Sequence, residues 1–311
     1  MNTVFMGSPE FAVPALEKLI VNKYDIVAVY TQPDKPAGRG QQLTCCPVKS
    51  VALARGLNVV QPENFKDAQR IKELDELKPD IIVIAAYGRI LPDAILNIPR
   101  FRCVNIHPSL LPRYRGPSPI AAAILSGDVT TGVTIMLVEH KVDSGPILSQ
   151  QEMRITDEDT TGTLSHCLAE LGADLLIETL PEWTAGRILP VAQDESLASY
   201  TRMETREDGA LDWRQPAERL WRQVRALSPW PGCYTRWKNM TIKINKVIPV
   251  NVVHSKPPGE VIILPKTYPA RVAVQTGLGL LGFVTMQPEG KREMTGQEFI
   301  AGHQDFPGSI L

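Results

Sequence analysis

The stretch Asp67-Ala-Gln-Arg-Ile-Lys-Glu-Leu-Asp-Glu-Leu-Lys-Pro-Asp-Ile-Ile-Val-Ile-Ala85 carries the strongest signal of the fold. Residues 67–77 place apolar side chains at helical spacing, and Lys78-Pro79 ends the helix because proline cannot continue it. Residues 80–85 form an apolar run of strand length, typical of a strand buried on both faces. A helix that leads into such a strand indicates a parallel sheet covered by helices.

Strands and helices alternate in the same way along the first half of the chain. The strands are predicted at residues 4–6, 26–30, 58–60, 80–85, 101–106 and 130–138. Helices are predicted between them, at residues 12–21, 48–54 and 67–77. We therefore predict an α/β fold with a doubly wound, mostly parallel sheet. In such sheets, ligands bind beyond the carboxyl ends of the strands.

Two polar side chains leave the end of the predicted strand at 101–106. Asn105 and His107 are separated by one residue, so in a strand they point to the same face. The prolines and glycine of residues 108–119 argue against helix and further strand, and so predict a loop. An amide donor and an imidazole at one place can stabilise an oxyanion and move a proton. The alternative is that both side chains satisfy loop backbone groups.

Asp143 follows the next predicted strand, at 130–138. If the two strands are neighbours, its carboxylate reaches His107, fixes the tautomer and raises the imidazole pKa, so that the charged form persists near neutrality. The alternative is an ordinary Asp-Ser-Gly turn, for which all three residues are well suited. Spacing alone leaves both interpretations open.

A second domain is predicted after a change in pattern. Residues 188–205 lose periodicity, as a linker would, which gives domains at 1–187 and 206–311. A helix is expected at 212–227, where Arg222 lies on an arginine-rich face that contacts either phosphates or only solvent. Short segments broken by Pro and Gly then predict a small, all-β barrel, with strands at residues 241–247, 260–263, 271–276 and 280–286.

The net charge of −1 is unevenly distributed. Residues 1–204 carry 19 Lys and Arg against 25 Asp and Glu, whereas residues 205–311 carry 14 against 9. A basic C-terminal part favours a nucleic-acid partner, with chance variation of a solvated surface as the alternative.

The sequence argues against a disulfide framework, a bound metal and a membrane span. The five cysteines form no C-x-x-C pair, which argues against a disulfide framework or a zinc site. His107, His140 and Asp143 lack the spacing of a metal motif, so no metal is predicted. No apolar run approaches the roughly 18 residues of a membrane span, and residues 1–6 run straight into a strand without a basic segment. We expect a cytoplasmic protein with no membrane association.

An ordered set of motifs resembles the folate-dependent formyltransferases. Asn105, His107 and Asp143 look like the family's signature, together with residues 109–116, Ser-Leu-Leu-Pro-Arg-Tyr-Arg-Gly. Further matches span nearly the whole chain in the family's order, at Gly7–Phe11, Gln32–Gly40, Ala85–Gly88 and Ser228–Gly232. The first of these lacks the G-x-G-x-x-G pattern, which argues against NAD.

The resemblance implies transfer of the formyl group of 10-formyltetrahydrofolate to the α-amine of initiator methionyl-tRNA, with Asn105, His107 and Asp143 as catalytic residues. It places the folate against Ser109, Leu110, Leu111 and Pro112, with the backbone around Arg89 and Leu91 at the pterin edge. It assigns the acceptor end of the tRNA to the long segment 31–49, and its basic positions match Lys35, Arg39 and Lys49. It also specifies an oligonucleotide-binding (OB) type of barrel. A mobile lid is the alternative for the segment, and a monomer is expected.

Three other functions stay open. The formyl group could go to a small amine, such as glycinamide ribonucleotide or an amino sugar, although the nucleotide version would not need the basic C-terminal part. Water could replace the amine, which would make the enzyme a 10-formyltetrahydrofolate hydrolase. The chain could also be a non-catalytic RNA-binding protein with a folate-sensing domain.

Overall fold

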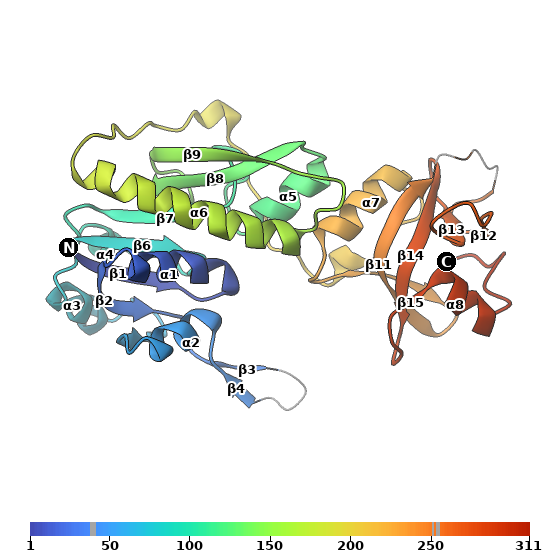
Figure 1. Cartoon of the computed structure of the whole chain (residues 1–311), viewed down its shortest axis with the longest axis horizontal. Coiled ribbons are helices and arrows are strands. Elements are labelled where there is room, and N and C mark those ends of the chain that lie inside the picture. The colour runs from blue at the N-terminus through green and yellow to red at the C-terminus, as the bar shows by residue number, and fades with distance from the viewer. Residues whose placement is uncertain (38–41, 251, 253–255) are drawn as a thin grey trace. The chain divides into compact units, whose positions relative to one another are not determined.

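The computed structural model of the chain describes residues 1–37, 42–250, 252 and 256–311. They form two compact units (Figure 1). The first unit comprises Met1–Pro119, Thr130–Arg154 and Leu164–Arg202, and the second comprises Ile120–Val129, Ile155–Thr163 and Met203–Leu311. The second unit therefore includes two segments that interrupt the first along the sequence. Most of the segment predicted as a linker, up to Arg202, falls in the first unit.

The first unit is built on a seven-stranded sheet in the order β5-β2-β1-β6-β7-β8-β9. Its strands are β1 (Asn2–Gly7), β2 (Asp25–Tyr30), β5 (Val59–Val60), β6 (Ile81–Ala85), β7 (Cys103–His107), β8 (Thr130–Leu137) and β9 (Ile147–Arg154). The five strands from β5 to β7 are parallel, and β8 and β9 run antiparallel to their neighbours. The predicted doubly wound, mostly parallel sheet is confirmed.

Helices cover both faces of this sheet. On one face, Leu74 and Ile95 pack into a core cluster with side chains of β1, β2, β6 and β7. On the other face, α6 comes so close to β7 that a Cβ on Gly172 would lie 2.7 Å from Cγ2 of Ile106. The helices of the first half are η1 (Glu10–Ala12), α1 (Val13–Val21), α2 (Pro47–Ala54), α3 (Ala68–Glu76), α4 (Asp93–Leu96), α5 (Pro119–Ser126) and α6 (Thr161–Thr184).

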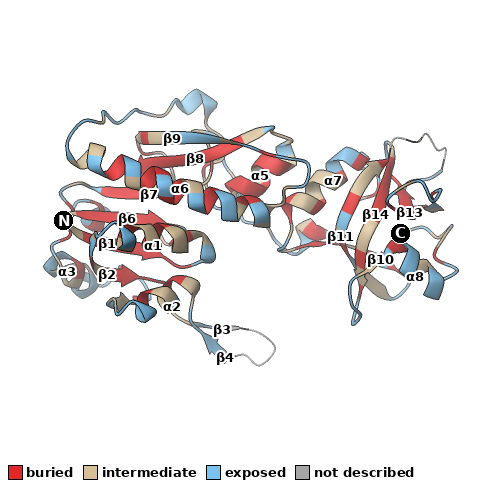
Figure 2. Cartoon of the chain, viewed as in Figure 1, coloured by how far each residue is buried: buried red, intermediate tan, exposed pale blue. Residues whose placement is uncertain are grey.

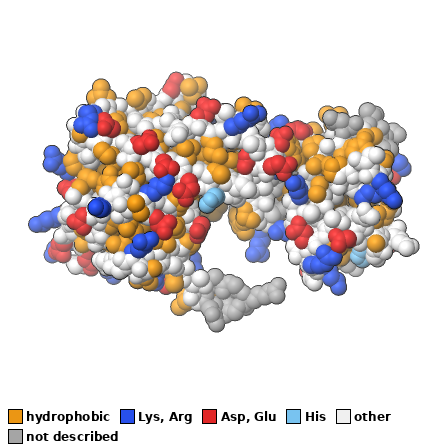
Figure 3. Space-filling view, viewed as in Figure 1, with side chains coloured by type: hydrophobic (Ala, Val, Ile, Leu, Met, Phe, Trp, Pro, Cys, Tyr) orange, Lys and Arg blue, Asp and Glu red, His pale blue; other side chains and the backbone are white. Residues whose placement is uncertain are grey.

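Burial follows this layering. The central strands are buried, whereas the outer faces of the helices are exposed (Figure 2). Charged side chains of both signs are interspersed over the face drawn in Figure 3. No helix among the described residues has the length and apolar character needed to cross a membrane.

The strand order places a topological switch between β1 and β6. From β1 the chain moves outward to β2 and β5, and it then returns to the other side of β1 to form β6 and β7. The loops at the carboxyl ends of β1 and β6 therefore diverge, which opens the crevice where such sheets bind ligands. Asn105 and His107 lie at the same end of the next strand, β7.

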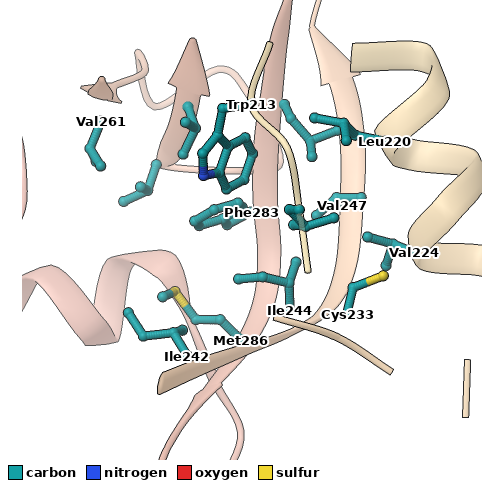
Figure 4. Packing of buried hydrophobic residues seen from close by; sticks show 14 of the residues in the cluster. Trp213, Leu220, Val224, Cys233, Ile242, Ile244, Val247, Val261, Phe283 and Met286 are labelled. Atoms are coloured by element: carbon teal, nitrogen blue, oxygen red, sulfur yellow. The ribbon is translucent and has the colours of Figure 1, made fainter. Parts of the chain in front are cut away.

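The second unit is organised around an antiparallel sheet in the order β10-β11-β14-β13-β12, with β15 against β14. Trp213 and Phe283 lie at its core with ring centroids 6.0 Å apart, and Leu220 and Val224 pack against them (Figure 4). Among the described residues no pairing joins β10 to β12, so the sheet is not closed by a ladder. Its elements are η3 (Glu207–Gly209), α7 (Ala217–Ala226), β10 (Cys233–Trp237), β11 (Met240–Val250), β12 (Val261–Ile263), β13 (Val272–Gln275), β14 (Leu280–Pro288), β15 (Met294–Thr295) and α8 (Gly296–Gly302).

Some elements were not predicted. They include a short hairpin of β3 (Lys35–Ala37) and β4 (Gln42–Thr44), together with α4, α5, β9, β10, β15 and α8. The prediction that residues 108–119 exclude helix is wrong at its end, because α5 begins at Pro119. A proline is tolerated in the first turn of a helix, where its missing N–H has no partner to lose.

Candidate active site

Asn105 is the half-buried residue of an otherwise buried strand, β7. It pairs with Ile84 of β6 on one side and Met136 of β8 on the other, and both neighbours are buried. Within the part of the chain that the structure describes, its carboxamide makes no hydrogen bond. Two N–H donors are therefore held by a rigid strand and remain free to bind a ligand.

His107 ends the same strand and is 4% exposed. Its Nε2 lies 3.0 Å from the carbonyl oxygen of Tyr114, and its Nδ1 lies 3.5 Å from Oδ2 of Asp143. A carbonyl oxygen only accepts hydrogen bonds, so Nε2 carries a proton. In the neutral ring, Nδ1 then presents its electron pair toward the carboxylate.

Burial lowers the pKa of His107 below its ordinary value. The Asp143 carboxylate and the Tyr114 carbonyl both raise this pKa, but they do not offset the loss of solvation. The expectation that the imidazolium persists near neutrality is therefore wrong, because desolvation outweighs the nearby charge. At neutral pH the imidazole is uncharged and can accept a proton.

Asp143 is held by the loop that follows β7. Its Oδ2 accepts a hydrogen bond of 2.8 Å from the N–H of Gly116. Its backbone adopts a φ of +50°, in the left-handed region that few non-glycine residues occupy. The loop thus holds the carboxylate beside His107.

The loop at residues 109–112 is anchored by two side chains of β8 and β9. Thr134 Oγ1 donates to the carbonyl of Ser109 (2.6 Å) and accepts from the N–H of Leu111 (3.1 Å). Gln150 Nε2 donates to Thr134 Oγ1 (2.8 Å) and to the carbonyl of Leu111 (2.9 Å). These bonds satisfy buried backbone groups and hold the loop in one conformation.

Some of the side chains expected to bind folate make their contacts within the loop itself. Ser109 is fully buried and its Oγ donates to the carbonyl of Arg113, at 2.7 Å. Leu111 is buried, whereas Leu110 and Pro112 are half-buried. Leu110 and Pro112 thus retain surface for a ligand, and the contribution of Ser109 is to shape the loop.

Arg89 and Leu91 follow β6. Nη1 of Arg89 donates to the carbonyl of Glu63, and its Nε is buried without a hydrogen-bond partner among the described residues. The Leu91 side chain lies in the core cluster beside Tyr87. Because the Leu91 side chain is packed in this cluster, the backbone of Leu91, rather than its side chain, can contact a ligand.

The four basic residues expected to bind tRNA differ in their surroundings. Lys35 is exposed on the β3–β4 hairpin, with Nζ 3.2 Å from Oε1 of Gln32. Arg39 lies outside the described residues. Lys49 is half-buried, with Nζ 2.5 Å from Oδ2 of Asp34, so a carboxylate already compensates its charge. Arg222 pairs with Glu218, at 3.2 Å.

The metal alternative finds no support in the arrangement of His140. Its ring is exposed, and its Nδ1 lies 3.6 Å from Oδ1 of Asp93. In the described part of the chain, no group of three or more His, Cys, Asp or Glu side chains is placed to hold a metal ion.

Four further residues shape the site: Thr134, Gln150 and Gln193, which the sequence did not single out, and Tyr114, which lies in the 109–116 motif but was given no role. Gln193 Nε2 donates to the carbonyls of Asp143 and Gly145, both at 2.8 Å. The contribution of Tyr114 is a backbone carbonyl, which leaves no trace in residue type. Thr134 and Gln150 lie within strands, where a single polar side chain does not by itself indicate a site. Gln193 lies in a segment without periodicity.

A doubly wound sheet with an amide donor and a neutral imidazole at the carboxyl ends of its strands defines an α/β enzyme suited to group transfer. Residues 1–180 match the family model described as formyl transferase, and residues 204–304 match the formyl transferase C-terminal domain. The chain belongs to the formyl transferase family.

Relatives match along the whole chain. The chain is 47% identical to a methionyl-tRNA formyltransferase of Roseiflexus sp. (strain RS-1), over 97% of this chain and 92% of that protein. It is 43% identical to a methionyl-tRNA formyltransferase of Caldanaerobacter subterraneus subsp. tengcongensis, with both chains covered completely.

Solved structures with lower identity share the fold. An N-formyltransferase from Helicobacter canadensis, in complex with folinic acid and dTDP-3-aminofucose, matches with a TM-score of 0.67 and 19% identity, over 90% of this chain and 98% of that one. HypX from Aquifex aeolicus, in complex with tetrahydrofolic acid, matches with a TM-score of 0.63 and 17% identity, over 99% of this chain and 48% of that one.

Proposed function

We propose that this protein transfers the formyl group of 10-formyltetrahydrofolate to the α-amine of methionyl initiator tRNA, giving N-formylmethionyl-tRNA for translation initiation. The observation that carries the proposal is the free carboxamide of Asn105, on the same face of β7 as the His107–Asp143 pair. Full-length similarity to methionyl-tRNA formyltransferases supports the choice of acceptor.

The reaction begins when the free amine attacks the formyl carbon. A new C–N bond forms and the formyl oxygen becomes an oxyanion. The N–H groups of Asn105 donate to this oxygen, and because β7 holds the carboxamide in advance, no reorganisation is needed as the charge develops. This stabilises the tetrahedral intermediate relative to the substrate.

The His107–Asp143 pair handles the proton. The attacking nitrogen becomes positively charged and must lose a proton, and the neutral imidazole with its free Nδ1 is a suitable acceptor. The Asp143 side chain is 17% exposed, whereas the His107 side chain is 5% exposed, so the proton enters through the carboxylate. The pair then returns the proton to N10 as the C–N10 bond breaks, so no proton is consumed overall.

Different groups bind the folate and the tRNA. The backbone of residues 109–112, held by Thr134 and Gln150, contacts the folate. Lys35 on the exposed hairpin and the cations of the second unit contact the tRNA. Since one chain carries all three catalytic side chains, we propose that it acts as a monomer, in the cytoplasm where initiator tRNA is used.

The test is a product assay with 10-formyltetrahydrofolate and four acceptors side by side: methionyl initiator tRNA, the same tRNA uncharged, other aminoacyl-tRNAs, and glycinamide ribonucleotide. We expect formylmethionyl-tRNA as the main product. Release of formate without transfer would identify a hydrolase, and formylation of the small amine alone would overturn the tRNA assignment.

A further inference from the structure

Arg115 has a fully buried guanidinium group that takes no part in the steps of formyl transfer. Its Nη2 and Nη1 donate to the two carboxylate oxygens of Glu195, at 2.8 and 3.2 Å. Its Nε donates to Oε1 of Gln193 (3.0 Å), and Nη1 also donates to the hydroxyl of Tyr200 (2.9 Å). A buried cation is costly unless such bonds satisfy it. All of these partners come from one segment, residues 193–201.

The same cluster reaches the backbone of Asp143. Because Arg115 binds Oε1 of Gln193, the orientation of that amide is fixed, and Nε2 points the other way. Nε2 donates to the carbonyls of Asp143 and Gly145, both at 2.8 Å. The turn that carries the carboxylate is therefore tied to the Arg115 guanidinium through a single side chain.

The 193–201 segment also fixes the other neighbour of the imidazole. Ser199 accepts from the N–H of Tyr114 through its Oγ (2.9 Å) and from the N–H of Arg115 through its carbonyl (2.8 Å). The N–H of Thr201 donates to the carbonyl of Arg115, at 2.8 Å. The Tyr114 carbonyl that accepts from His107 lies between these anchored groups.

We propose that Arg115 is a positioning residue for formyl transfer, which binds the 193–201 segment and thereby holds both neighbours of the His107 imidazole in place. The proposal rests on the proposed function for its kinetic part. Under this proposal, the 193–201 segment is part of the active site, although its sequence resembles that of a linker.

The test uses Gln193→Leu and Glu195→Gln in the full chain. Gln193→Leu removes both hydrogen bonds to the Asp143 turn, and Glu195→Gln removes the charge that Arg115 binds. The matched control is Glu182→Gln, which breaks a bidentate pair of two exposed side chains at the C-terminal end of α6, with both Arg187 bonds at 2.6 Å. Thermal unfolding of each variant verifies the fold.

We expect kcat for formyl transfer to fall about tenfold or more in Gln193→Leu, as loss of positioning at a catalytic group typically produces, with KM for both substrates unchanged. A smaller fall is expected in Glu195→Gln, and none in the control. Equal losses in all three variants, or normal kcat in folded Gln193→Leu, would overturn the proposal.

A second readout does not depend on the reaction. In ¹⁵N-histidine-labelled protein, NMR titration gives the pKa of His107 and its tautomer. Because the Asp143 carboxylate raises this pKa, a loosened turn should lower it further in Gln193→Leu. The proton should stay on Nε2, since the Tyr114 carbonyl is unaffected. An unchanged pKa would refute the positioning role, whereas wild-type protein without transfer activity would refute only the proposed function.

Discussion

The His107 imidazole is placed so that each nitrogen has a different neighbour. The Tyr114 carbonyl requires a proton on Nε2, and Asp143 faces the electron pair on Nδ1. Burial lowers the pKa of the ring, so the neutral form is the resting form at neutral pH. A neutral imidazole next to a carboxylate can take up one proton and release it again. Transfer of a formyl group from one nitrogen to another requires this, because the attacking amine loses a proton and N10 gains one.

This arrangement predicts a pH dependence. Activity needs neutral His107, so it should be lost as pH falls through the pKa of this residue, below the ordinary value of about 6.5. In Asp143→Asn the carboxylate no longer raises the pKa, so this limb should move to still lower pH, at reduced kcat. Single-turnover rates over pH measure it.

Protonation of the substrate amine gives a separate limb at higher pH that is common to wild type and variant. A His107 limb that moves upward in Asp143→Asn, or does not move, would show that the carboxylate does not act on the imidazole.

Among the secondary-structure elements, those with a strong apolar period could be predicted and those without it could not. The run at residues 80–85 became β6, buried throughout, and the 67–77 pattern became α3. β9 was missed because it is an edge strand whose middle, Ser149 to Glu152, is polar and largely exposed. Spacing left the His107–Asp143 approach as one of two interpretations, and the pairing of β7 with β8 explains why the two side chains meet. The direction of the His107 pKa shift depends on burial, which the sequence does not report.

The bonds that β8 and β9 make to the loop at 109–112 give a second prediction. Thr134→Val preserves shape but deprives the Ser109 carbonyl and the Leu111 N–H of their Thr134 bonds. Each buried group left without a partner costs about 1–3 kcal/mol. We expect weaker folate binding by calorimetry and a lower free energy of unfolding. Thr131→Val, on the same strand, is the control, and equal folate affinity in both variants would contradict the anchoring role.

In the molecule as a whole, the net charge differs between the N-terminal and C-terminal parts of the chain. Residues 205–311 carry 14 Lys and Arg against 9 Asp and Glu. On β10 and β11, Arg236 and Lys243 are exposed, and Tyr234 pairs directly with Lys243. Alternate strand positions share a face, so these three side chains present a basic surface with an aromatic ring. Such a surface suits a phosphate backbone.

The double variant Arg236→Gln/Lys243→Gln tests this surface. The affinity for tRNA should fall, and the slope of log affinity against log salt should become shallower by about 0.7–0.9 per lost phosphate contact. Folate affinity should not change. Lys238→Gln, whose cation is paired with Asp305, is the matched control. An unchanged slope in the double variant would exclude this face as a phosphate contact.

The role of Asn105 can be measured in one experiment, the single-turnover rate of formyl transfer to methionyl initiator tRNA by Asn105→Ala. The carboxamide has no partner among the described residues, so its removal leaves no protein group unsatisfied and the fold should be unaffected. We predict a rate lower by about 10²–10³-fold, the usual cost of losing one oxyanion donor, with folate and tRNA dissociation constants unchanged. A rate close to that of wild type would mean that the oxyanion is stabilised elsewhere.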